Sequence, residues 1–220
     1  MMFSRVLVEK NVMHLDATQK LLKKLSKPYE EIDKYEEYFG VFKKPYLHKR
    51  TDLNLFIAEK KGQLVKRAPE AYGVPGDPHY YFIHAFNCIY ECEYCYLQGY
   101  FNSPDIVLFM NHQDIINEIE STILRHPNAE KIWFHAGEFS DSLALSHLTG
   151  EIDMYWDAFS NKENVLLELR TKSANVRELL KKPPLENVIT SFSMAPEKQV
   201  KQLDRKAAPL KARFAAIKTL

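Results

Sequence analysis

Short apolar runs and helical spacings alternate along the first 75 residues. They predict a strand over residues 4–9, a helix over residues 15–26 and a second short helix within the acidic and aromatic segment 28–39. Two short strands are expected at residues 53–57 and 63–65, joined by a Lys-Lys-Gly turn. The densest turn signal of the chain follows at residues 73–78, so we expect a domain boundary near residue 75. The part before it, residues 1–75, is predicted to be a small α+β region.

The pattern beyond residue 75 becomes regular. Strands are expected at residues 80–85, 105–110, 131–135, 165–170 and 188–193, and helices over 112–125, 142–159, 174–181 and from Pro209 to about residue 218. Asn111 is the expected cap of the helix over 112–125, whose isoleucines form one stripe. Strands that alternate with helices indicate a parallel sheet, and such sheets bind ligands at the carboxyl ends of their strands. We therefore predict an α/β fold with its site on the loops that follow the strands.

Composition narrows the class of protein but not its chemistry. The 220 residues are 45% apolar and 27% charged, which is ordinary for a globular protein, and no apolar run approaches the length of a membrane span. The net charge is +1, with the excess of Lys and Arg in residues 1–75. Many of these basic residues form a patch in the sequence, which is typical of a solvated surface or of a face that contacts phosphates. Its basic residues, with Tyr46 and His48 interleaved, are Lys43, Lys44, Lys49, Arg50, Lys60, Lys61, Lys66 and Arg67.

All three cysteines lie in one short segment, Cys88, Cys92 and Cys95, with the spacing C-x3-C-x2-C. Three thiolates on one loop can hold three corners of a cubic iron–sulfur cluster and leave the fourth iron open to a ligand. A disulfide framework is disfavoured because three cysteines leave one unpaired. A zinc site usually needs four ligands, and His84 would be a poorly placed fourth. Three unrelated buried cysteines are the remaining alternative. A cluster and free thiols fit a reducing cytoplasm.

Further candidates stand where predicted strands end. Glu138 follows the strand at 131–135 and is placed to accept hydrogen bonds from a ligand ammonium, although its loop could simply cap the next helix through Ser140 or Asp141. Lys172 follows the strand at 165–170 and could pair with a ligand carboxylate, or could be an ordinary surface lysine. Tyr94 and Tyr96 flank Cys95, where they could face the site or pack in the core.

These motifs resemble a known family. The cysteine loop is similar to that of the radical S-adenosylmethionine (SAM) superfamily, and the run Tyr94-Cys95-Tyr96-Leu97-Gln98 resembles the cluster loop of the spore photoproduct lyase family. The likeness continues through Ser140-Asp141, residues 147–149, residues 170–172, residues 191–193 and Pro209-Leu210, and so covers roughly residues 80–215.

The resemblance implies a partial (β/α) radical-SAM barrel and its chemistry. A reduced [4Fe-4S] cluster would cleave SAM to methionine and a 5′-deoxyadenosyl radical, which in this family abstracts hydrogen from a thymine–thymine lesion in DNA. It implies a flavodoxin- or ferredoxin-type electron donor and no membrane partner. The residues it implies are Cys88, Cys92 and Cys95 for the cluster, Glu138, Ser140, Lys172 and Ser193 for SAM, and Tyr96 and Tyr94 for catalysis.

Two departures from the family pattern alter these expectations. Glu138 stands where the lyases carry a hydrogen-donating cysteine, and a carboxyl O–H is too strong to donate a hydrogen atom as a thiol does. We therefore expect a related family member with another substrate, or hydrogen return through Tyr94 or Tyr96. The predicted barrel also stops after about four strands, so we expect a barrel truncated at its C-terminal side, with an unpaired last strand. The alternatives are a radical-SAM enzyme on a non-DNA substrate and an inactive iron–sulfur module.

Overall fold

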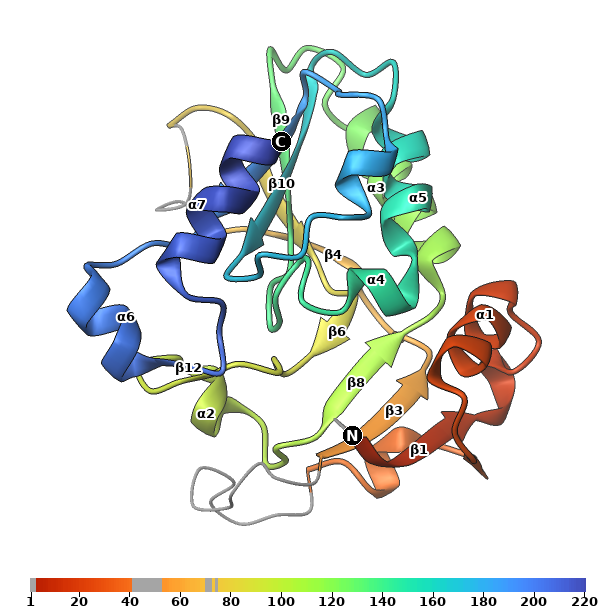
Figure 1. The fold of residues 1–220 in the computed structure, drawn as a ribbon. Coiled ribbons are helices and arrows are strands. Elements are labelled where there is room, and N and C mark those ends of the chain that lie inside the picture. Colours follow the sequence, from red (N-terminus) through yellow and green to blue (C-terminus); the bar gives the residue numbers. More distant parts are fainter. Residues whose placement is uncertain (1–2, 41–52, 70–72, 74) are drawn as a thin grey trace.

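Two five-stranded sheets form the centre of the computed structural model, which describes residues 3–40, 53–69, 73 and 75–220 (Figure 1). The first sheet has the order β2-β1-β3-β8-β6 and is parallel except for β6. Its strands are Glu30–Ile32 (β2), Phe3–Glu9 (β1), Leu53–Ala58 (β3), Ile106–Phe109 (β8) and Ala85–Phe86 (β6). The fold is therefore a mixed α/β fold, as predicted.

The second sheet has the order β11-β10-β9-β5-β4 and is parallel except for β4. Its strands are Val188–Phe192 (β11), Val165–Thr171 (β10), Ile132–Ala136 (β9), His79–Phe82 (β5) and Val65–Arg67 (β4). Within the described residues β11 pairs only with β10, so it is the open edge that the sequence led us to expect.

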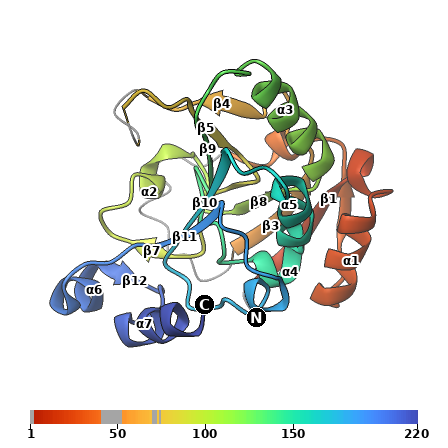
Figure 2. The same cartoon turned by 90° about the horizontal axis from the view of Figure 1, so that it is seen from above.

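Helices cover the sheets. Helix α3 (His112–Leu124) packs beside α5 (Glu151–Phe159) on one side of β9 and β10 (Figure 1). The predicted isoleucine stripe forms this contact, since Ile115, Ile116 and Ile119 are buried in one cluster with Phe134 and Leu167. Seen from above, α1 (Asp16–Leu25) lies at the opposite end of the molecule from α6 (Glu197–Leu203) and α7 (Leu210–Thr219) (Figure 2). The described residues contain no helix that is both long and apolar enough to cross a bilayer.

One bent segment, residues 79–86, joins the two sheets because it contributes β5 to one and β6 to the other. Hydrogen bonding also crosses the predicted domain boundary. Strand β3 pairs with β8, and β4 pairs with β5 in the register Val65↔Phe82. The division near residue 75 stays a prediction, and the two regions it separates share both sheets.

The N-terminal region corrects two predictions. Residues 28–39 form β2 and a 3-10 helix at Tyr35–Glu37 instead of an α-helix, because Glu30–Ile32 extends the edge of β1. The strands at 53–58 and 65–67 are not a hairpin. Strand β3 lies between β1 and β8, so its two edges are already paired, and β4 pairs in the other sheet. Half of the basic residues of the predicted patch, Lys43, Lys44, Lys49 and Arg50, lie outside the described residues, as do Tyr46 and His48.

The later elements follow the predictions more closely. The strands expected at 105–110, 131–135, 165–170 and 188–193 are confirmed as β8 to β11, while the one at 80–85 divides into β5 and β6. The helix expected over 142–159 is broken at Gly150 into α4 (Ser146–Thr149) and α5. Asn111 is at the N-cap position of α3, but its side chain exchanges hydrogen bonds with the Lys60 backbone instead of capping.

The helix expected over 174–181 is only a 3-10 turn at Leu179–Lys181. Side chains explain its absence: Ser173 Oγ accepts from the Asn175 backbone N–H at 3.0 Å, and Asn175 Oδ1 accepts from the Arg177 backbone N–H. Such local bonds compete with helical ones. Helix α6 and the short antiparallel pair of β7 (Glu91–Cys92) with β12 (Asp204–Arg205) had no recognised signal in the sequence.

Candidate functional site

Four loops that follow strands of the second sheet meet at one edge. Strands β5, β9, β10 and β11 are mutually parallel, so their carboxyl ends lie on the same side. The cysteine loop follows β5 and β6, residues 137–141 follow β9, Lys172 follows β10 and Ser193 follows β11. The topology therefore places the loops that carry the candidate residues at one edge of the sheet.

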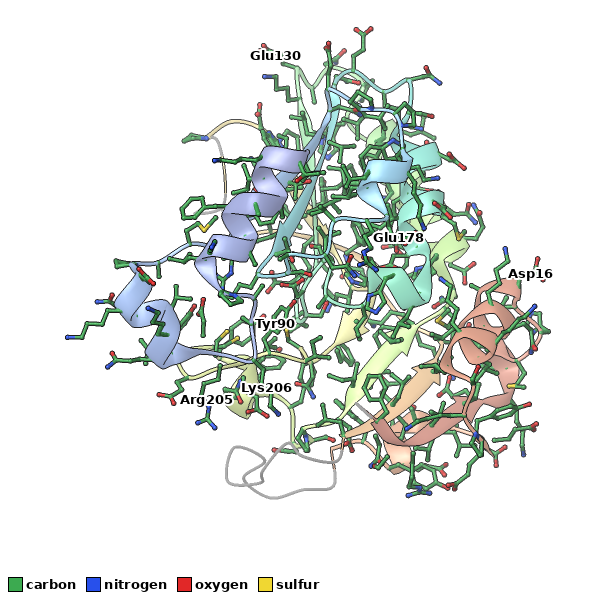
Figure 3. All side chains as sticks on the ribbon, viewed as in Figure 1. Asp16, Tyr90, Glu130, Glu178, Arg205 and Lys206 are labelled. Carbon is green, nitrogen blue, oxygen red and sulfur yellow. The ribbon has the colours of Figure 1, made fainter. Side chains whose placement is uncertain are left out.

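Short backbone contacts shape the cysteine loop. Strand β7 contains Cys92 and pairs with β12 in the register Cys92↔Asp204. The Cys95 backbone N–H donates to the Cys92 carbonyl at 3.0 Å, and the Tyr90 backbone N–H donates to Cys88 Sγ at 3.5 Å. Tyr90 lies near the middle of the molecule rather than at its rim (Figure 3). Helix α2 (Leu97–Tyr100) then ends the loop.

Burial shifts the titration of two of the three thiols. Burial raises the pKa of Cys88 well above its usual range, and the charges of Asp141, Cys92 and Cys95 raise it further. Burial also raises the pKa of Cys92 to about 11, with Lys172 opposing and Asp204 and Cys95 reinforcing the shift. The surroundings of Cys88 and Cys92 therefore favour neutral thiols until a positive charge arrives. Metal binding supplies such a charge and deprotonates the thiol.

A single-ion site is not what this arrangement offers. Among the described residues, no three His, Cys, Asp or Glu side chains are grouped to hold one metal ion, and all three cysteines are free. The zinc alternative with His84 as fourth ligand is therefore not supported. A cubic cluster places a different iron at each cysteine, so its ligands need to surround a volume and not converge on a point. Three cysteines on one loop, with no fourth in the sequence, are the ligand set of a cluster that has one open iron.

The loop after β9 is held in place by Asp141. Its carboxylate accepts hydrogen bonds from the backbone N–H groups of Leu143 and Ala144, at 3.0 and 2.9 Å. It also accepts from Thr171 Oγ1 at 2.6 Å and from the Lys172 backbone N–H at 2.7 Å, which ties this loop to the end of β10. Burial raises the pKa of Asp141, and these four donors oppose that rise. Asp141 is thus the residue that caps this loop.

Glu138 is left to face the cysteine loop. The loop turns tightly before it: Gly137 has φ +82°, and a Cβ there would lie 2.5 Å from Ser142 Oγ. Tyr96 donates its hydroxyl hydrogen to Glu138 Oε1 at 3.0 Å. Burial raises the pKa of the Tyr96 phenol, and the Glu138 carboxylate reinforces that effect. Tyr96 is nevertheless about half exposed, so the predicted alternative of a core tyrosine is wrong.

Lys172 and Tyr94 also meet. The Lys172 ammonium lies 5.3 Å from the centroid of the Tyr94 ring, within the range of a cation–π contact. The same ammonium lowers the pKa of Cys92 against the effect of burial. Lys172 therefore points to the cysteine loop and is half-buried, so it is not an ordinary surface lysine.

A buried ion pair behind Tyr94 escaped prediction. Arg213 of α7 donates to Asp204 Oδ2 at 2.7 Å, and both side chains are essentially inaccessible. Tyr94 donates its hydroxyl hydrogen to the other carboxylate oxygen of Asp204. Arg213 also donates to the Ser193 and Ala208 carbonyls, each at 2.7 Å. The network fixes the cysteine loop and the end of β11 to α7. In the sequence, the only sign of this network is an arginine on the buried side of the last helix.

The two candidate serines stand in different surroundings. Ser140 Oγ is buried, and no hydrogen-bond partner for it exists in the described part of the chain. Ser193 continues the pairing of β11, since its backbone N–H donates to the Thr171 carbonyl at 2.9 Å. Both serines therefore lie at the shared edge that also carries Glu138 and Lys172.

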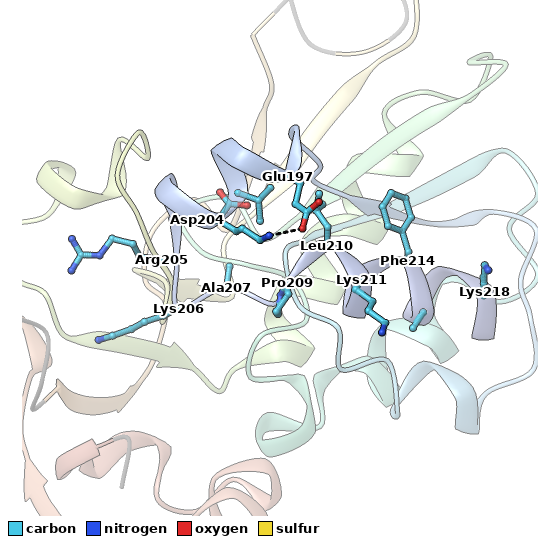
Figure 4. A pocket seen from close by; sticks show the side chains of 13 residues that line it. Glu197, Asp204, Arg205, Lys206, Ala207, Pro209, Leu210, Lys211, Phe214 and Lys218 are labelled. Atoms are coloured by element: carbon cyan, nitrogen blue, oxygen red, sulfur yellow. Dashed lines mark ion pairs between the residues drawn. The ribbon is translucent and has the colours of Figure 1, made fainter.

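A basic groove adjoins the cysteine loop through β12. It lies between α6 and α7 and encloses about 720 Å³ (Figure 4). Lys211, Phe214 and Lys218 reach it from α7, and Phe214 is 53% exposed. Three more cations line it: Lys201 pairs with Glu197 at 2.7 Å, while Arg205 and Lys206 pair with Glu93 and Glu91 on the cysteine loop.

Comparison with protein families identifies the fold's relatives. A family model described as spore photoproduct lyase matches residues 5–220. The chain belongs to the spore photoproduct lyase family. The match begins in β1, so the family extends over the N-terminal region as well as over the cysteine loop and the second sheet. A comparison with curated proteins found no match.

Solved structures of spore photoproduct lyase share this fold. A lyase variant bound to a dinucleoside spore photoproduct matches with a TM-score of 0.82 and 20% identity, and a double variant that holds AdoMet and the same ligand matches with 0.79 and 20%. The structure of a lyase complexed with dinucleoside spore photoproduct matches with 0.79 and 21%. The matches cover all of this chain but only 64–65% of those chains, so this chain spans about two thirds of their length.

Proposed function

We propose that this chain is a radical SAM lyase whose [4Fe-4S] cluster is bound by Cys88, Cys92 and Cys95. The single observation that carries this proposal is the presence of three cysteines, without a fourth, within eight residues of one loop at the strand edge of a chain of the spore photoproduct lyase family. When bound, the cluster would supply the electron that cleaves SAM into methionine and a 5′-deoxyadenosyl radical. A cluster of this kind needs a reducing compartment, consistent with the predicted cytoplasm.

The residues around the thiols have chemistry suited to SAM. We infer that Glu138 accepts hydrogen bonds from the methionyl ammonium and that Lys172 pairs with the methionyl carboxylate. Both already face the cysteine loop, through Tyr96 and Tyr94 respectively. Ser140 and Ser193 supply further hydrogen bonds from the same edge. Together the four would hold the methionyl end of SAM at the edge that carries the cysteine loop.

Tyr96 and Tyr94 are proposed to take part in returning hydrogen to the product. Their surroundings differ: Tyr96 is bonded to Glu138, whereas Tyr94 is bonded to the buried Asp204. Because Tyr94 is held by an ion-paired carboxylate, it is the more rigid of the two. Tyr96 is therefore the better candidate to approach a substrate, and Tyr94 to support it.

The proposed substrate is a thymine-derived photolesion in DNA. Structural relatives are solved with a dinucleoside spore photoproduct, and a basic groove lies next to the cysteine loop. A lesion buried in duplex DNA would have to leave the base stack to reach the site. Glu138 favours a second candidate, a radical SAM reaction on a non-DNA substrate, because a carboxyl cannot replace the hydrogen-donating cysteine.

We further propose that the second sheet is part of a partial barrel that is incomplete in this chain. The open edge of β11 and an adjoining apolar groove of about 650 Å³ support this, since Phe192, Ile217 and Leu220 line that groove and parallel sheets are normally covered. The remaining third of the relatives' length would extend the sheet there. A flavodoxin- or ferredoxin-type protein is the proposed electron donor.

Anaerobic reconstitution tests the proposal. The protein is loaded with iron and sulfide, reduced with dithionite and incubated with SAM. We expect 5′-deoxyadenosine to form, and Cys92→Ala to abolish both the cluster absorbance and the product. An intact cluster that yields no 5′-deoxyadenosine would overturn the proposal that the chain is an enzyme. Where 5′-deoxyadenosine does form, adding DNA that carries the photolesion separates a DNA substrate from a non-DNA substrate.

The role of Glu138 is tested by SAM binding rather than turnover. Loss of a charge-assisted hydrogen bond is worth about 1.5–3 kcal/mol, so we expect Glu138→Gln to weaken SAM binding about 10- to 100-fold. Tyr96→Phe is the matched control because it removes only the hydroxyl that bonds Glu138. Equilibrium dialysis at equal iron content measures both, and equal affinities for the two variants would show that Glu138 does not contact SAM.

A further inference from the structure

A small, partly open cavity lies beside the cysteine loop, between Cys88 and the segment that leads into α4 and α5. It encloses about 20 Å³. Much of its wall is apolar, from residues such as Ile106, Leu108 and Leu145. The rest is polar, and it comes from His84, Asn87, Ser140, Asp141 and Glu151.

Six buried side-chain atoms have no partner within the described residues, and three of them belong to residues that line this cavity. These three are His84 Nδ1, Asn87 Oδ1 and Ser140 Oγ. His84 is 6% exposed and Asn87 is 1% exposed, so bulk water does not reach them. Buried polar atoms nearly always have a hydrogen-bond partner in protein or ordered water. Three atoms without a partner around one cavity therefore indicate a common partner inside it.

The orientation of Asn87 is fixed by other bonds. Its Nδ2 donates to the Ser103 carbonyl at 2.8 Å and to the Asp105 carbonyl at 2.6 Å. Turning the amide over would place an oxygen against two carbonyls, so Oδ1 is the atom left without a partner. Asn87 therefore still requires a hydrogen-bond donor, and the cavity that it lines can hold one.

His84 and Ser140 can each donate or accept a hydrogen bond. Burial lowers the pKa of His84 to about 4, so its ring is neutral at pH 7 and Nδ1 either donates or accepts one bond. The Ser140 hydroxyl can do both. The two carboxylates already have donors: Asp141 has four, and Glu151 accepts from the Thr149 hydroxyl. The occupant must thus combine donors with acceptors.

We propose that one ordered water molecule occupies this cavity and bridges His84, Asn87 and Ser140. The volume is enough for one water and too small for two, and a water needs two to four polar partners. A metal cation fits less well, because hard cations require about six oxygen ligands and Asn87 Oδ1 and Ser140 Oγ are the only unpartnered oxygens among the described lining.

The position of this water gives it a role in the site. Asn87 precedes Cys88 directly, while Ser140 belongs to the loop after β9 that also carries Glu138. The water therefore couples the first cysteine of the loop to the strand-end loop opposite. It is a structural member of the site, and through Ser140 it would also help to position one of the residues proposed to bind SAM.

A crystal structure of the full chain at about 1.5 Å tests the proposal directly. We expect one solvent peak in the cavity, within hydrogen-bond distance of at least two of the three atoms. An empty cavity would overturn the proposal. Soaking with rubidium supplies a second arm, since an anomalous peak at this position would replace the water with a cation.

Thermal unfolding gives an independent measurement, because the change in Tm on Ser140→Ala should differ between a hydrated and a dry cavity. In a hydrated cavity Ser140→Ala removes a partner of the water, so Tm should fall by about 2–4 °C. In a dry cavity the same change removes an unpaired hydroxyl, so Tm should stay the same or rise, which would overturn the proposal. Ser146→Ala is the control: its hydroxyl donates to the Leu143 carbonyl at 3.1 Å, and its loss lowers Tm in both cases. All samples are compared at equal iron content.

Discussion

At the scale of single residues, Asp204 and Arg213 form the interaction whose loss should be felt most. Both side chains are buried, so removing the charge of one leaves the other uncompensated, at a cost of about 3–5 kcal/mol. We therefore expect Asp204→Asn to lower the free energy of unfolding by about that amount, measured by urea denaturation.

The control for this prediction lies on the adjacent helix. Glu197 pairs with Lys201 at 2.7 Å, but both side chains are at least 70% exposed. Exposed pairs contribute about 0–1 kcal/mol, so Glu197→Gln should change stability little. Equal effects of the two substitutions would mean that the buried pair is not a structural anchor of the cysteine loop.

Glu151 should make stability depend on pH near neutrality. Its side chain is buried, and that burial raises its pKa from 4.5 to about 7. The pKa of Glu151 is higher in the folded than in the unfolded chain, so its protonation stabilises the folded chain. This contribution to the free energy of unfolding is complete below about pH 4.5 and is lost as the pH rises through about 7. The loss is up to about 3 kcal/mol for a shift of this size.

Glu151→Gln should remove that dependence while keeping the shape of the side chain. Thermal unfolding at pH 5 and pH 8 is the measurement, and we expect the difference in Tm between these pH values to shrink in the variant. Asp157→Asn, an exposed carboxylate on the same helix, should leave the difference unchanged. Parallel pH profiles for Glu151→Gln and the original chain would contradict the assignment.

Site residues could be predicted where the pattern that marks them lies within a short stretch of sequence. Cys88, Cys92 and Cys95 lie within eight positions, so their spacing alone indicated a shared loop. The bond between Tyr94 and Asp204 joins positions 110 residues apart, and no local pattern specifies it. Glu138 was recognised from its place after a strand, but its contact with Tyr96 became visible only in the structure.

At the scale of elements, Gly150 divides what would otherwise be one helix. Its φ of +72° stops α4 and starts α5, and a Cβ there would contact nothing closer than Lys24 Nζ at 3.9 Å. Any effect of Gly150→Ala is therefore a backbone effect, which we expect to lower stability by about 1–2 kcal/mol. Gly99→Ala is the control, since Gly99 lies in α2 without a positive φ. A stabilising Gly150→Ala would show that α4 and α5 can fuse.

The elements that were predicted wrongly have a common cause. Residues 28–39 were settled by the free edge of β1, and the strand predicted at 63–65 does form, as β4, but it pairs with β5 and not with β3. Residues 174–181 have a helical pattern, but the side chains of Ser173 and Asn175 bind nearby backbone groups. Strongly periodic segments such as α3 were predicted well because their burial reinforces their preference.

At the scale of the whole molecule, the two sheets place a chemical site and a charged groove side by side. The parallel strands bring distant loops to one edge, which the alternation of strands and helices predicted. The groove between α6 and α7 was not predicted, because α6 was not recognised and β12 exists only through its pairing with β7. Its cations come from residues 197–220, which hold seven Lys or Arg against two Asp or Glu, an excess that the acidic balance of the rest of residues 76–220 conceals.

If DNA is the substrate, the groove should contribute to the salt dependence of its binding. Lys211 and Lys218 reach the groove from α7, are exposed and have no ion pair within the described residues. Each phosphate contact contributes about 0.7–0.9 to the slope of log K against log salt concentration. We therefore expect the double variant Lys211→Gln, Lys218→Gln to reduce the magnitude of that slope by about 1.4–1.8.

Fluorescence anisotropy with a labelled thymine-rich oligonucleotide between about 50 and 200 mM salt measures the slope over the range where phosphate contacts dominate. The double variant Lys20→Gln, Lys23→Gln on α1 has the same net charge and lies at the far end of the molecule, so its slope should match that of the original chain (Figure 2). Equal reductions in both double variants would assign the effect to net charge. Binding that persists with an unchanged slope in the groove variant would place the DNA elsewhere, whereas no binding at all would favour the non-DNA substrate.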